Sequence, residues 1–182
     1  MTDTTGRRAF LSRVAKIATG AAVVAALPTV LAGTASAAMD GLWCFCTKCY
    51  GLFSGNVINF SGVCPAGGQH SYAGYIFSLP YNVSENANAQ ANWWECGKCL
   101  GLYYRGYPSD GVCPAGAGHN PSSDTVNHVL THDVPQTPTA QDSWRFCVKC
   151  YVLFFNGYPT AGRCPTGGEH KEAGYNFVLA HN

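Results

Sequence analysis

One pattern occurs three times in this sequence, and it restricts the possible folds more than any other feature. Each copy has a Cys-x2-Cys pair, a third cysteine 14 or 15 residues later, and a histidine six residues after that. Successive copies start 50 and 51 residues apart, which is typical of arrays of small units that contact their neighbours. The twelve residues are Cys46, Cys49, Cys64 and His70, then Cys96, Cys99, Cys113 and His119, then Cys147, Cys150, Cys164 and His170.

The three cysteines and one histidine of each copy are the ligand types of a four-coordinate structural zinc site. In an exported protein, ten cysteines would also fit a disulfide framework. Three cysteines cannot all pair within one copy, however, and a disulfide across a Cys-x2-Cys pair closes a small, strained loop. We therefore predict three zinc ions, one per repeat. Disulfides, alone or beside metal sites, are the alternative.

Strand-forming segments follow each cysteine pair, and no segment after residue 37 has the pattern of an amphipathic helix. In the first repeat we expect an outward strand at Leu52-Phe53, a return strand through Gly62-Val63-Cys64, and a final strand at 74–79 with alternating apolar residues. The fold prediction is a small, mostly β protein with little or no helix: a tandem array of three zinc-ribbon-like β-hairpin repeats arranged as a rigid rod. The expected repeats are residues 38–90, 91–140 and 141–182.

A single repeat is too small to fold without help. A core of this size supplies at most ~3–5 kcal/mol, whereas a structural zinc supplies an apparent ~10–16 kcal/mol at neutral pH. We therefore expect the metal to decide whether a repeat folds. The lysine inside each Cys-x-Lys-Cys (Lys48, Lys98, Lys149) is expected to offset the negative charge of the thiolates, with a merely solvated lysine as the alternative.

The spacing resembles that of zinc ribbons, although the second half of each copy is Cys-x5-His instead of a second Cys-x2-Cys. The chain also resembles a family of exported bacterial proteins built from tandem Trp-x-x-Cys-x-Lys-Cys … Gly-x-Cys-Pro-x-Gly-Gly-x-His units behind a twin-arginine signal. This likeness covers the whole chain after the signal. It implies architecture and export, and no particular activity.

The N-terminal segment has the features of an export signal. Arg7 and Arg8 precede an apolar pair, and an uncharged, alanine-rich run follows and ends in Ala35-Ser36-Ala37, a small-x-small cleavage site. We predict that residues 1–37 are a twin-arginine signal peptide, that the protein is secreted, and that no membrane segment remains after cleavage. A membrane anchor is the alternative, but glycines and a proline interrupt the run.

The charge after residue 37 argues against one class of partner. Seven basic and nine acidic residues remain there, so the formal charge is −2. Nucleic-acid-binding proteins present a basic surface to the phosphates. We therefore expect no nucleic-acid partner.

Several residues stand outside the repeated pattern. His128 occupies a position that holds Phe77 and Phe177 in the other copies, so we expect it to pack in the core; a second metal or acid–base site with His132 and Asp133 is the alternative. Cys44 has no counterpart, and we expect a free, partly buried thiol; an intermolecular disulfide or a competing zinc ligand is the alternative.

Aromatic residues provide the only hint of a ligand. Tyr107 and Tyr158 fall in turns, where an exposed ring with a polar edge can stack on a sugar, whereas the tryptophans are expected in the core. No catalytic group stands out, because serine and the acidic residues are sparse and a filled Cys3His site is closed.

We therefore predict a non-enzymatic, multivalent binding protein for cell-wall or extracellular glycan, with a protein partner as the second choice. One alternative is a zinc or copper capture protein. Another is a disulfide-linked secreted domain that binds a protein.

Overall fold

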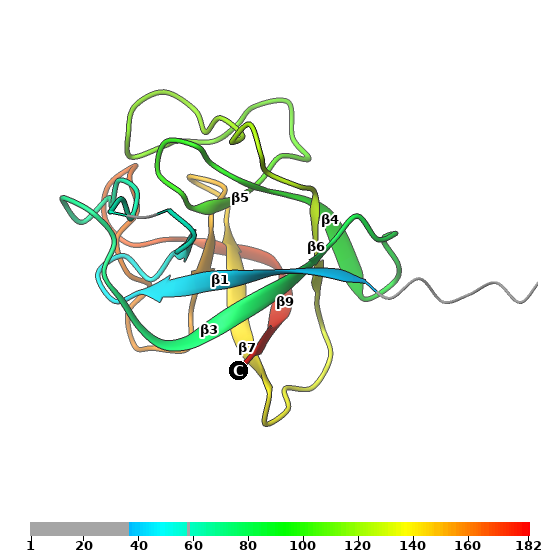
Figure 1. Cartoon of the computed structure of the whole chain (residues 1–182). Helices are drawn as coiled ribbons and strands as arrows, with labels where there is room; N and C mark the ends of the chain where they lie inside the picture. The colour runs from blue at the N-terminus through cyan, green and yellow to red at the C-terminus, as the bar shows by residue number, and fades with distance from the viewer. Residues whose placement is uncertain (1–36, 58) are drawn as a thin grey trace, which may run out of the picture. The chain divides into compact units, whose positions relative to one another are not determined.

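The computed structural model of the chain describes residues 37–57 and 59–182, so the predicted signal peptide with Arg7 and Arg8 lies outside the described residues. The described residues belong to one compact unit. In the described part every regular element is a strand, which confirms the prediction of a small, all-β fold (Figure 1). No helix there is long and apolar enough to cross a membrane. The strands are β1 (Ala38–Cys46), β2 (Leu52–Ser54), β3 (Tyr72–Tyr81), β4 (Ala89–Glu95), β5 (Leu102–Tyr104), β6 (His128–Thr131), β7 (Ala140–Cys147), β8 (Leu153–Phe155) and β9 (Glu172–His181).

Each repeat contributes three antiparallel strands: β1–β3 form the first repeat, β4–β6 the second and β7–β9 the third. In the first repeat, β1 pairs with β2 on one side and with β3 on the other. The Cys-x2-Cys pair is itself the hairpin turn between β1 and β2, since Tyr50 N donates to Cys46 O at 2.8 Å and Cys46 N to Gly51 O at 3.0 Å. The predicted outward strand is therefore present. Its partner is the strand before the cysteine pair, which the sequence analysis did not anticipate.

The predicted return strand through Gly62-Val63-Cys64 is wrong, because this segment forms no strand. Its backbone groups bond within a tight loop instead: Cys64 N donates to Gly68 O, and Gly67 N donates back to Cys64 O. The loop therefore returns the chain to the cysteine pair without pairing along β2.

The third strands of the repeats close the array into a ring. Tyr81 of β3 pairs with His128 of β6, His132 bridges to Phe177 of β9, and His181 of β9 pairs with Phe77 of β3. These three contacts join repeat 1 to 2, repeat 2 to 3, and repeat 3 back to 1. The expectation of a rod is therefore wrong: the repeats surround a common axis, and each repeat is joined to both of the others.

The core lies around this axis and is shared by all repeats. Three fully buried tryptophans each meet the edge of a ring from the next third strand: Trp43 with His128, Trp93 with Phe177, and Trp144 with Phe77, at 5.0–5.1 Å between ring centres. Phe146 and six leucines complete the cluster; the leucines are Leu52, Leu79, Leu102, Leu130, Leu153 and Leu179. Because each tryptophan is covered by a neighbouring repeat, no single repeat can bury it alone.

A bulge before each tryptophan sets its hydrogen bonding. The pairing register shifts between Asp40 and Trp43, between Gln90 and Trp93, and between Gln141 and Trp144. The side chain three residues before the tryptophan then reaches the indole N–H in two repeats: Trp43 Nε1 donates to Asp40 at 3.0 Å, and Trp144 Nε1 donates to Gln141 at 3.2 Å. Among the described residues Trp93 Nε1 has no partner, although Gln90 holds the same position.

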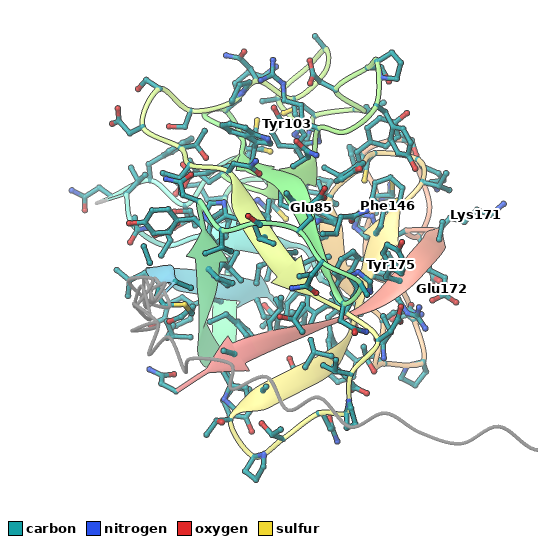
Figure 2. All side chains as sticks on the ribbon, turned by 90° about the vertical axis from the view of Figure 1, so that its right-hand side faces the viewer. Glu85, Tyr103, Phe146, Lys171, Glu172 and Tyr175 are labelled. Atoms are coloured by element: carbon teal, nitrogen blue, oxygen red, sulfur yellow. The ribbon has the colours of Figure 1, made fainter. Side chains whose placement is uncertain are left out.

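Tyr103, which is labelled in Figure 2, lies in a second buried cluster beside the cysteines and offers a test of an unsatisfied hydroxyl. It occupies the position of Phe53 and Phe154, and its hydroxyl is buried with no partner among the described residues. An unsatisfied buried hydroxyl costs about 1–3 kcal/mol. Tyr103→Phe is therefore expected to raise the free energy of unfolding by about that amount, measured by urea denaturation of the zinc-loaded protein. The matched change Phe154→Tyr should lower it. A less stable Tyr103→Phe protein would show that the hydroxyl has a partner.

Candidate metal centres

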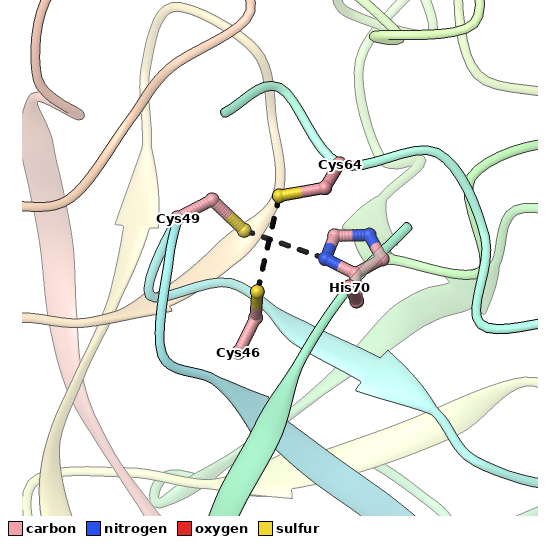
Figure 3. Close-up of side chains that lie close together, drawn as sticks. All are labelled: Cys46, Cys49, Cys64 and His70. Carbon is pink, nitrogen blue, oxygen red and sulfur yellow. Dashed lines mark hydrogen bonds between the residues drawn. The ribbon is translucent and has the colours of Figure 1, made fainter. Parts of the chain in front are cut away.

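The structure brings the twelve predicted residues together as three separate clusters, one in each repeat. In every cluster three sulfurs and one ring nitrogen lie within 4.8 Å of one another. In the first, Cys46 Sγ lies 3.9 Å from Cys64 Sγ, and Cys49 Sγ lies 3.5 Å from His70 Nδ1 (Figure 3). The corresponding distances in the second cluster are 3.9 Å and 3.5 Å.

These distances fit a tetrahedral metal site. Zinc bond lengths of about 2.3 Å to sulfur and 2.0–2.1 Å to nitrogen place two sulfurs about 3.8 Å apart, and a sulfur and a nitrogen about 3.6 Å apart. A disulfide would need about 2.05 Å, and none of the ten cysteines is paired. The disulfide alternative is therefore wrong in this structure. The clusters can hold three metal ions, and thiolate with imidazole is a donor set that suits zinc.

Local backbone geometry brings the ligands together. The first two cysteines come from the end of a strand and the turn after it, where Tyr50 adopts a left-handed conformation (φ 65°). Leu100 and Tyr151 do the same in the other repeats, at φ 59° and 71°. The third cysteine and the histidine come from the loop that follows the hairpin. Each site therefore joins the cysteine-pair turn to the loop before the third strand, next to the end of the ladder in which Cys46 pairs with Tyr72.

Each histidine turns one nitrogen to its own cluster and the other to the next repeat. Nε2 of His70 lies 3.1 Å from Cys99 O, that of His119 lies 3.1 Å from Cys150 O, and that of His170 lies 3.2 Å from Cys49 O. A carbonyl can only accept, so Nε2 carries the proton and Nδ1 is left as the metal ligand. The ring is also stacked on an aromatic side chain of its own hairpin, as His70 is on Phe53 at 4.6 Å.

This hydrogen bond connects the clusters in a circle, because the accepting carbonyl belongs to a cysteine of the next cluster. A glycine packs at the same point: a Cβ on Gly111, whose φ is 64°, would clash with Cys150 O, and Gly62 and Gly162 are placed likewise. The loop that carries the third cysteine and the histidine of one repeat therefore packs against the cysteine-pair turn of the next repeat.

Without metal, the side chains of a cluster share their protons. Hydrogen bonds from Cys49 and Cys64 lower the pKa of Cys46, whereas the bond to Cys46 raises that of Cys49. Burial acts to lower the pKa of His70, but the neighbouring Cys46 and Cys64 outweigh it and raise this pKa to about 9. His119 and His170 also have pKa values raised to about 9. Metal binding must therefore displace protons from both sulfur and nitrogen.

Each of the three lysines donates to the loop of its own repeat that carries the third cysteine and the histidine. Lys48 Nζ donates to Gly67 O at 2.7 Å, Lys98 Nζ to Gly116 O and Gly118 O, and Lys149 Nζ to Gly167 O and Glu169 O. The lysine of the cysteine-pair turn is thus fixed to the loop that carries the other two ligands. Its effect on the charge of the thiolates stays a prediction.

The residues outside the repeated pattern, which are Cys44, His128 and His132, lie outside the three metal clusters. His128 is buried, with Nε2 2.8 Å from Asp40 Oδ2, and it packs in the slot of Phe77 and Phe177. His132 pairs instead with Asp133 at 3.1 Å, so the structure does not bring His128 and His132 into one metal group. Cys44 is buried outside the clusters, and burial raises the pKa of its thiol.

Tyr107 and Tyr158 are half exposed and lie in clefts between repeats, away from the cysteines. Comparison of the chain with protein-family models, with curated proteins and with solved structures found no match.

Removing one ligand tests whether the centres act together. Cys113→Ser is expected to reduce the zinc content below three ions per chain in native mass spectrometry, and to lower the unfolding midpoint of the whole unit in a single transition. The reason is that the second repeat covers Trp43 and accepts the hydrogen bond of His70. Cys44→Ser is the matched control and should keep three ions. Loss of one repeat with the other two still folded would contradict this linkage.

Acidification should release the metal. Zinc binding requires thiolates and a neutral imidazole, so the bound metal lowers the pKa of the ligating cysteines, and the stability it confers is lost as the pH falls. We expect full loading at about pH 7.5 and release by about pH 4–5. A colorimetric zinc chelator followed against pH measures this directly, with circular dichroism to detect the accompanying unfolding. Retention of metal at pH 4 with an unchanged fold would contradict it.

Proposed function

We propose that this chain is a secreted, non-enzymatic binding protein in which three structural zinc ions stabilise a rigid ring of repeats, and that its ligand is a cell-wall or extracellular glycan. The observation that carries the proposal is the set of hollows between neighbouring repeats, two of which are lined with half-exposed tyrosines. Concave, mainly apolar sites with a few polar groups are where small ligands bind.

The metal centres support a structural role for zinc. Each offers four protein ligands, which fill a tetrahedral ion and leave no position for a substrate. The nine sulfurs are buried, with at most 3% of each cysteine exposed. A metal ion exchanges slowly from a closed and buried site. This burial therefore favours a structural ion over a protein that captures and releases metal.

Secretion is part of the proposal and rests on the sequence. Arg7, Arg8 and the alanine-rich run after them would direct the chain to the twin-arginine pathway. That pathway carries folded proteins, so thiolates could bind zinc in the reducing cytosol before export. The metal would then protect the sulfurs from oxidation outside the cell.

Repetition suits a binding protein of low intrinsic affinity. Two or more equivalent sites on one rigid scaffold convert later binding steps into intramolecular ones, with gains of ~10²–10⁴ in avidity when the ligand is itself repetitive. Cell-wall and extracellular polysaccharides have that property.

The first test is binding of the zinc-loaded full chain to an array of neutral oligosaccharides and to insoluble cell-wall polysaccharide. We expect retention on at least one polysaccharide, with weaker binding of its short fragments. Protein denatured with chelator is the control and should not bind. If no glycan retains the loaded protein, the glycan part of the proposal is wrong, whereas the metal stoichiometry remains to be judged by native mass spectrometry.

A further inference from the structure

Three equivalent clefts lie at the three seams of the ring, and their linings differ. One wall of each cleft comes from one repeat and includes the hairpin loop and the residue three positions before the tryptophan. The other wall comes from the first and third strands of the next repeat. We name each by the repeats that form it. The 3–1 cleft contains Gln141, Phe155, Tyr158, Phe45, Tyr75 and Phe77. The 2–3 cleft contains Gln90, Tyr104, Tyr107, Phe146, Tyr175 and Phe177. The 1–2 cleft contains Asp40, Val57, Glu95, Ser122, Asp124 and Val126.

The first two clefts match position by position. Tyr158 corresponds to Tyr107, Tyr75 to Tyr175, Phe45 to Phe146, and Gln141 to Gln90. In the 1–2 cleft these positions hold Val57, Val126, Glu95 and Asp40. The same backbone site is thus aromatic and uncharged at two seams, and acidic at the third.

Other aromatic side chains pack against Tyr158 and Tyr107 in the two aromatic clefts and hold them in place. Tyr158 packs on Tyr50, Phe155 and Phe45 at 5.2–6.0 Å between ring centres. Tyr107 packs on Tyr104, Tyr151 and Phe146 at 5.3–5.9 Å. These contacts leave each ring about half exposed, at 51%. A ring fixed in this way can bind a ligand without losing further side-chain freedom.

A second tyrosine stands on the facing repeat of each cleft. Tyr75 is stacked on His181, and Tyr175 on His132, each at 3.7 Å between ring centres. Figure 2 shows Tyr175 and Phe146 close together on the same face of the molecule. Two rigid tyrosines, one from each repeat, therefore border every aromatic cleft.

The polar groups in the two clefts are neutral. Neither lining includes a charged side chain, and each includes one glutamine amide. Gln141 is fixed by the indole of Trp144. In the 2–3 cleft Gln90 holds the same position, but the buried indole N–H of Trp93 has no partner among the described residues. Such a site offers apolar faces and a few hydrogen bonds, and it attracts neither cations nor anions.

From these observations we infer that the 3–1 and 2–3 clefts each bind one neutral pyranose unit of a glycan, and that the 1–2 cleft does not. A pyranose presents an apolar C–H face, which stacks on the fixed tyrosine, and hydroxyls, which the glutamine amide can bind. The inference rests on the proposed glycan function and gives it a location, a charge class and a number of sites.

The size of the clefts favours this occupant over a protein. Their volumes are about 210 Å³ and 390 Å³, below and near the lower end of the range for ligand pockets, which suits a single ring-sized group. A stable protein interface buries about 800 Å² per partner, far more than a cleft of this size provides. A charged peptide would also find no opposite charge in either lining.

The test uses the zinc-loaded full chain, with chitotetraose and cellotetraose as soluble probes in isothermal titration and the corresponding insoluble polymers in retention assays. Tyr158→Ala and Tyr107→Ala each remove one exposed ring. Val57→Ala is the matched control, because Val57 holds the same position at the acidic seam. Three bound zinc ions and an unchanged circular dichroism spectrum serve as the check on folding.

We expect the original chain to bind two equivalents of a neutral probe. Each tyrosine variant should bind one equivalent and lose about tenfold or more in retention on the polymer, because bivalency is lost. The double variant should not bind, and Val57→Ala should behave as the original chain. If the original chain binds and both tyrosine variants bind equally well, the cleft assignment is wrong while the glycan function stands. Binding of an acidic polyuronate alone would overturn the neutral class, and binding of no glycan would overturn both proposals.

Discussion

The hydrogen bond from each cluster histidine to a cysteine carbonyl of the next repeat is the interaction on which the arrangement depends. It fixes the proton on Nε2 and so presents Nδ1 to the metal. It also places the loop of one repeat against the cysteine-pair turn of its neighbour. The same histidine therefore belongs both to a candidate metal centre and to the contact between repeats. A repeat that lost its neighbour would keep its four ligands but lose the group that orients one of them.

Closure of the ring has a second consequence, which concerns the core. Each tryptophan is covered by the third strand of another repeat, so the apolar surface that drives folding is buried only when all three repeats are present. A small repeat gains little from its own core. Closure of the ring therefore buries the tryptophans, and metal ions held by the three clusters would add to the order of each repeat.

The seams are also where the repeats have diverged. The metal clusters, the tryptophans and the leucines are the same in all copies, since each is needed for folding. The clefts carry no such requirement, because their tyrosines are half exposed. At the 1–2 seam Asp40 has instead become the partner of Trp43 and of the buried His128. An acidic group there accepts from two buried donors, whereas the glutamines of the other two seams have a phenylalanine in place of His128.

The sequence by itself determined the ligand sets, because Cys-x2-Cys turns and the tight loop after the third cysteine are local features with fixed spacing. It also determined the short strands after each cysteine pair and the burial of the three repeated tryptophans, which follow from composition. The first strand of each repeat was missed, since a bulge at Leu42, Asn92 and Ser143 interrupts its alternation. Only the tertiary structure decided that the array is a ring, because the closing pairs Tyr81–His128 and Phe77–His181 join residues about 50 and 100 positions apart, and no local pattern fixes such distant registers. The clefts also depend on the tertiary structure, because each is lined by two repeats and forms only when the ring has closed.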